Sequence, residues 1–160
     1  MDKQLLHEKI ILALETIHQS AINAARQAHV TATDKESIAE NKYDTFGLEA
    51  SYLAHGQAKR VAEYEVDLAN YLNITVSKFD NDSKIAIGAL VHLADAKGAA
   101  QCLFLSPVAG GLKLRVDDKE ITLITPSSPL GAALINRSVG DEVELSLAGQ
   151  TKMYDIMAIY

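Results

Sequence analysis

The stretch SSPLGAALINRSVGDEVEL, residues 127–145, decides the fold of the second half of this sequence. Ser128 is a favourable helix N-cap, and Pro129 suits the first helical position because that position needs no paired amide hydrogen. Together these two residues predict a short helix over 129–136.

The residues that follow this helix predict two paired strands. Gly140-Asp141 forms a turn that leads into EVELSL at 142–147. A short AGQT connection then leads to KMYDIMAIY at 152–160, which is the pattern of a β-hairpin.

Further short apolar stretches precede the helix. They are KIAIGALVHLAD at 84–95, AQCLFLSP at 100–107, and GLKLRVDDKEITLITP at 111–126, in which a DDK turn separates two alternating segments. We therefore expect an α+β domain in which one helix covers a small antiparallel sheet.

The first half of the chain has a different composition. Residues 1–72 contain no proline and are rich in Ala, Leu, Glu and Gln, which favour helix. Apolar or small residues recur every three or four positions from Leu6 to Ala28 and again from Phe46 to Tyr71. Two helices of about 40 Å each, joined by a polar segment, predict an antiparallel coiled coil.

A cluster of Asn, Asp and Ser at 73–84 separates the two halves. We expect an antiparallel coiled coil over 1–75 and a sheet domain over 84–160.

Composition excludes several classes of protein. The formal net charge of -6 over 160 residues, with no Trp, argues against a dedicated nucleic-acid binder. No apolar run reaches the roughly 18–20 residues that a membrane span needs, and MDKQLLHEK lacks the pattern of a secretory signal. A single cysteine excludes an internal disulfide framework. We expect a cytoplasmic protein without membrane or sequence-specific nucleic-acid contacts.

The connector between the predicted helices is acidic and allows two interpretations. Thr33 with Glu36, and Ser37 with Glu40, have the spacing of capping boxes, so the acids could pair with amides at the start of the second helix. Alternatively, Asp34, Glu36 and Glu40 at the end of a long rod could be delivered to a distant site to bind a hard cation such as magnesium.

No complete active site is evident, so enzymatic activity is an open question. His7, His18 and His29 recur every eleven residues, which predicts a solvated helix face rather than a metal site. Cys102 lies among apolar residues and is expected to be a core thiol.

The 127–145 segment and the closing KMYDIMAIY resemble the C-terminal domain of the GreA/GreB transcript-cleavage factors, which carries S-P-[IL], then G-D, then two closing strands. IAIGALVHL matches the glycine-bearing strand that opens that domain. In the first half, Glu40-Asn41 matches an E-N pair near the tip of the family's coiled coil. The resemblance covers roughly residues 10–72 and 84–160.

The resemblance implies a factor that binds RNA polymerase. Its FKBP-like domain would dock at the rim of the secondary channel through Pro129, Leu130 and Leu134. Its coiled coil would enter the channel and present acids to the magnesium site of the polymerase. The factor would hold no tightly bound cofactor of its own, and Mg²⁺ would reside only in the polymerase active site.

The resemblance also implies site residues at the tip. Glu40 would be the metal-facing carboxylate, followed by Asn41, but the family's first acid is replaced here by Ser37. Asp34 or Glu36 would have to supply the missing charge. Two further hypotheses therefore stay open: a non-catalytic regulator that occupies the channel, and a coiled-coil module that binds other proteins.

Overall fold

The computed structural model describes residues 2–34, 45–80, 82–147 and 149–160. The chain divides into two compact units. One comprises Ile11–Ala69, and the other combines Met1–Ile10 with Asn70–Tyr160. The domain ranges 1–75 and 84–160 stay a prediction from composition.

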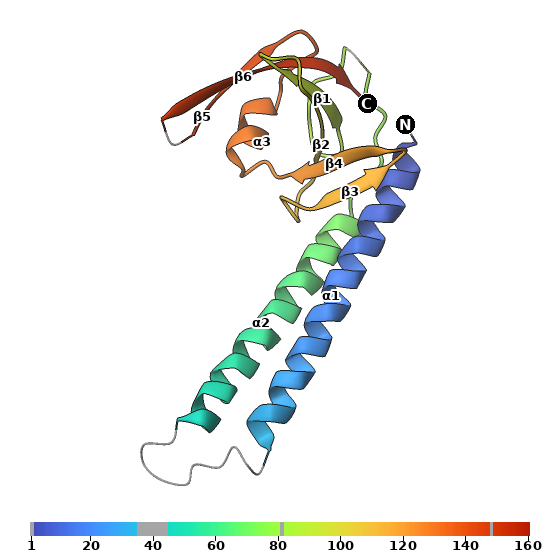
Figure 1. The fold of residues 1–160 in the computed structure, drawn as a ribbon. Coiled ribbons are helices and arrows are strands. Elements are labelled where there is room, and N and C mark those ends of the chain that lie inside the picture. The colour runs from blue at the N-terminus through green and yellow to red at the C-terminus, as the bar shows by residue number, and fades with distance from the viewer. Residues whose placement is uncertain (1, 35–44, 81, 148) are drawn as a thin grey trace. The chain divides into compact units, whose positions relative to one another are not determined.

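The unit Ile11–Ala69 is a helical hairpin, as the sequence predicts. It is built from α1 (Lys3–Thr33) and α2 (Phe46–Leu72), which lie antiparallel (Figure 1). Its buried apolar side chains are Leu14, Ala21, Ala28 and Ala50. In the described part of the chain, neither long helix has an apolar stretch that could cross a lipid bilayer.

The other unit is a six-stranded sheet with one short helix. Its elements are β1 (Leu90–Asp95), β2 (Ala100–Leu105), β3 (Lys113–Val116), β4 (Lys119–Ile124), α3 (Pro129–Leu134), β5 (Glu142–Leu147) and β6 (Gln150–Ile159). The spatial order of the strands is β3-β4-β2-β1-β6-β5.

The fold class is confirmed, but the sheet is mixed rather than antiparallel throughout. Residues Cys102–Leu105 of β2 pair in parallel with Ile121–Ile124 of β4. The chain leaves β2 and forms β3 at the outer edge, so that β4, the returning strand of the β3–β4 hairpin, lies beside β2. Sequence alternation alone could not reveal this crossover.

One face of the sheet forms a core with α3 (Figure 1). Leu134 of α3 is fully buried there, together with Val91, Leu103 and Ile156 from three strands. Leu130 and Ile135 are partly buried against the same cluster.

The opposite face of the sheet carries a second set of buried side chains. Strand residues alternate between faces, so Phe104 and Leu123 point away from the α3 core, yet both are fully buried. The beginning of α1 and the end of α2 provide the cover: the His7 ring lies edge-on to Phe104 with centroids 5.9 Å apart, and Tyr71 is also buried.

Residues 84–89 differ from the expected strand. The Ile85 amide donates to the Arg137 carbonyl at 2.8 Å, and the Asn136 amide donates to the Ile85 carbonyl at 2.9 Å. This segment is therefore held by the turn after α3, and β1 begins only at Leu90.

Candidate functional site

The predicted tip of the hairpin follows the last turn of α1, which ends at Thr33. The Thr33 hydroxyl donates to the His29 carbonyl at 2.9 Å, as expected for a residue inside a helix. The Asp34 amide follows with a 3.4 Å bond to the Thr31 carbonyl, and the Asp34 side chain is exposed. The interpretation of Thr33 as an N-cap of the second helix is therefore wrong.

Helix α2 begins at Phe46, directly after Thr45. The Thr45 hydroxyl donates to the Glu49 carboxylate at 2.9 Å, and Glu49 is the acid of the first turn, where it suits the helix dipole. Glu36 and Glu40 lie outside the described residues, so their proposed capping role stays a prediction.

Three of the four predicted catalytic residues, Glu36, Glu40 and Asn41, lie outside the described part of the chain, as does Ser37. Asp34 is the predicted acid that can be placed, and it follows α1 directly. Within the described residues, no three His, Cys, Asp or Glu side chains are grouped to hold a metal ion. An exposed acid such as Asp34 could supply one ligand to Mg²⁺, which is usually bound through one or two carboxylates plus phosphates or water.

The predicted docking helix is present, and its cap is the one expected. The Ser128 hydroxyl accepts from the Gly131 amide at 3.1 Å and donates to the Thr125 carbonyl at 2.7 Å, with Pro129 in the first turn. Gly131 is required here because a Cβ atom would overlap the backbone carbonyl of Thr125.

The three predicted docking residues do not share one surface. Leu134 is fully buried in the core, so its assignment to a partner surface is wrong. Leu130 and Leu134 are four residues apart and therefore lie on the same face of α3, and this face packs on the sheet. Pro129, Ala132 and Arg137 are exposed.

The beginning of α1 attaches to the sheet unit through polar contacts. Lys9 Nζ donates to the Arg115 carbonyl of β3 at 2.9 Å, and Lys3 Nζ donates to the Ser77 carbonyl at 2.6 Å. Lys3 also lies 4.5 Å above the centre of the Phe79 ring. Burial lowers the pKa of Lys3 to about 8.

His7 is buried rather than solvated, which contradicts the expected histidine stripe. Its ring lies 5.1 Å from that of Tyr71, and its Nε2 has no hydrogen-bond partner among the described residues. Burial, and then the charge of Lys3, lower the pKa of His7. Burial likewise raises the pKa of Tyr71.

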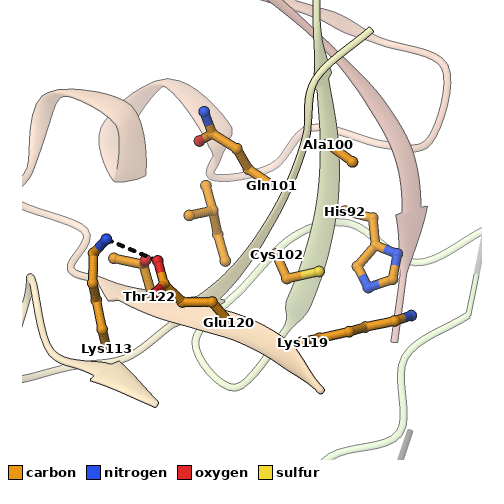
Figure 2. Close-up of a pocket in the computed structure, with 9 residues that line it drawn as sticks. His92, Ala100, Gln101, Cys102, Lys113, Lys119, Glu120 and Thr122 are labelled. Carbon is orange, nitrogen blue, oxygen red and sulfur yellow. Dashed lines mark hydrogen bonds and ion pairs between the residues drawn. The ribbon is translucent and has the colours of Figure 1, made fainter. Parts of the chain in front are cut away.

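The sequence analysis missed a cavity on the sheet. It has a volume of about 590 Å³, and Figure 2 shows its side chains. It is lined by His92, Ala100, Gln101, Cys102, Leu103, Lys113, Lys119, Glu120 and Thr122. Cys102 is half-buried at this cavity instead of lying in the core.

The signal for this cavity was partly visible in the sequence. Alternation in LVHLAD places His92 on the same face as Leu90, and Cys102 alternates with the core residue Leu103. That Lys119 comes close to them depends on the β2–β4 pairing, which no local pattern encodes.

Comparison with known proteins shows which family the chain is similar to. Residues 80–160 match the family described as Transcription elongation factor, GreA/GreB, C-term. The Transcription elongation factor GreA of Syntrophus aciditrophicus is 26% identical over 160 residues, which cover 100% of this chain and 88% of that protein. The GreA of Sinorhizobium medicae is 32% identical over 130 residues, which cover 78% of each.

A solved structure of GreA factor homolog 1 of Thermus thermophilus is also similar. It is 22% identical, with a TM-score of 0.36, and the match covers 96% of this chain and 94% of that one.

Proposed function

Because the chain belongs to the GreA/GreB family of transcription elongation factors, we propose that it binds RNA polymerase and inserts its helical hairpin into the secondary channel. The observation that carries this proposal is the family match, which covers the sheet unit in a chain that also has a long hairpin. The proposed role is regulation of elongation by occupying the channel.

In this proposal the sheet unit docks on the polymerase and the hairpin enters the channel. The sheet unit has a well-packed core and would dock on the outside of the polymerase. The docking surface that we propose is the exposed side of α3 and its flank, with Pro129, Ala132 and Arg137, because Leu134 is unavailable.

Stimulation of transcript cleavage is the second candidate function, favoured by the Glu40-Asn41 pair. Two cations can stabilise the attacking and leaving oxygens of phosphodiester hydrolysis, and tip carboxylates could help hold the second cation. We propose that Mg²⁺ belongs to the polymerase and that this chain adds ligands to it. Ser37 cannot supply the charge of a carboxylate. For this reason we favour channel occupation over cleavage as the function.

Binding can be tested by co-purification with core RNA polymerase. Ala132→Glu places a charge on the exposed side of α3 and is expected to weaken binding at least about tenfold. Ala96→Glu places the same charge on the exposed turn after β1 and serves as the matched control. Wild type that fails to bind the polymerase would refute the proposal, and equal binding by both variants would refute the docking surface.

Cleavage can be tested on backtracked elongation complexes saturated with the factor. If the tip acts on metal, Glu40→Gln removes stimulation without weakening binding, and the double change Asp34→Asn with Glu36→Gln does the same. Ser37→Asp raises activity because it restores an acid pair. Wild type that binds fully and stimulates no cleavage would leave channel occupation as the function.

A further inference from the structure

The cavity of about 590 Å³ lies where two parallel strands diverge. Pairing between β2 and β4 starts at Cys102 and Ile121. Before that point, Ala100 and Gln101 pair with β1, whereas Lys119 and Glu120 pair with β3. The side chains around this gap belong to four strands, and we call it the β2–β4 cavity.

The β2–β4 cavity carries an excess of positive charge. Its one carboxylate, from Glu120, is 2.8 Å from the ammonium of Lys113 on the neighbouring strand. The ammonium of Lys119 has no ion-pair or hydrogen-bond partner among the residues that the structure describes. The charge of Lys119 at the cavity is therefore not neutralised.

His92 supplies an unused polar atom beside this charge. Its ring packs against Tyr160 with centroids 5.0 Å apart, and its Nε2 is enclosed without a partner in the described chain. Burial, followed by the charge of Lys119, lowers the pKa of His92. A neutral imidazole can donate one hydrogen bond, and buried polar atoms normally have a partner. An unused imidazole nitrogen therefore lies at the cavity beside the unpaired charge of Lys119.

The side chains at the cavity favour an anion over a metal ion. Figure 2 shows Cys102, His92 and Lys119 gathered at one side and the Lys113–Glu120 pair at the other. Cys102 and His92 are a cross-strand pair, but zinc sites in proteins use at least three side chains, and no such group exists in the described residues. The lysine beside them would also repel a cation.

We propose that the β2–β4 cavity binds the phosphate group of a small phosphorylated molecule. Lys119 and His92, which lie on the same face of the sheet as Cys102, donate to the phosphate. A tetrahedral anion with several acceptor oxygens suits donors from different strands, and the volume is within the range of small-molecule sites. This site is independent of the proposed binding to RNA polymerase.

The site can be tested by titrating the full chain with inorganic phosphate, pyrophosphate or ribose 5-phosphate. NMR signals of the His92 ring and of the backbone amides report binding. Sodium chloride at matched ionic strength and ribose without phosphate are the control ligands. Saturable 1:1 binding is expected at about millimolar concentration or below. A bound anion should also raise the pKa of His92, because an opposite charge nearby favours the protonated imidazole.

Lys119→Ala is expected to weaken binding about tenfold or more. Because it removes a charge that faces His92, it should also raise the pKa of His92 in the free protein. Dispersed backbone amide resonances like those of wild type would show that the variant is folded. Lys152→Ala, an exposed lysine on β6, is the matched control and should bind like wild type. The proposal is overturned if no phosphate compound saturates, if sodium chloride or ribose gives the same shifts, or if both variants lose affinity equally.

Discussion

The sheet unit and the helical hairpin are stabilised in different ways. In the sheet unit, large side chains such as Phe104, Leu123 and Tyr71 are almost completely buried. Among the described residues of the hairpin, three of the four buried apolar side chains are alanines, and a groove of about 300 Å³ lies between the helices. Large side chains such as Tyr52 and Leu53 remain exposed there.

This difference has a physical consequence. Burial stabilises at roughly 25 cal/mol per Å² of apolar surface, so alanine contributes far less than leucine or phenylalanine. The global stability should therefore depend on the sheet unit, and the hairpin should open locally at a lower free energy. Substitutions in matched pairs can test this contrast.

The largest expected effect is from Phe104→Ala. It removes a fully buried ring that contacts His7 and leaves a cavity, so the free energy of unfolding should fall by about 3–5 kcal/mol. Leu53→Ala removes a side chain that is 56% exposed in α2 and should change stability by about 0.5 kcal/mol or less. Urea denaturation measures both, and similar losses would contradict the contrast.

Gly131→Ala should have the next largest effect. The new Cβ would overlap the Thr125 carbonyl, so α3 or the loop before it must shift. Overpacking of this kind costs about 1–3 kcal/mol, which thermal unfolding can detect. A variant with the melting temperature of wild type would show that α3 adjusts freely and is not fixed by its N-terminal loop.

Acidification should weaken the packing of residues 3–10, the start of α1, within the sheet unit. Because burial lowers the pKa of His7 in the folded state, the unfolded chain binds the proton more readily. Stability should therefore be complete above the ordinary histidine pKa of about 6.5 and fall as the pH drops below it. In His7→Phe, the slope of unfolding free energy between pH 7 and 5 should be smaller; an unchanged slope would exclude His7 as a contributor.

The smallest expected effect has the opposite sign. Gly56 lies inside α2, and a Cβ at this position would contact nothing within 4 Å. Gly56→Ala should stabilise the hairpin by about 0.5–1 kcal/mol through helix propensity. Amide hydrogen exchange in α2 should slow while exchange in β1 stays the same; slower exchange in both would indicate that the units unfold together.

The family assignment and the element order were accessible from the sequence because they depend on local signals. Ser128-Pro129 places α3, and EVELSL coincides with β5. The predicted tip residues Glu36, Glu40 and Asn41 remain predictions, because they lie outside the described part of the chain.

Apart from residues 84–89, the sequence alone determined which segments are helices and strands, since capping, propensity and periodicity act between residues that are close along the chain. The tertiary structure decided which faces are covered: it buries His7 and Leu134, pairs β4 in parallel with β2, and brings Lys119 to His92. These outcomes depend on contacts between residues far apart in the chain. A periodic pattern shows that a face is apolar but not which element packs on it.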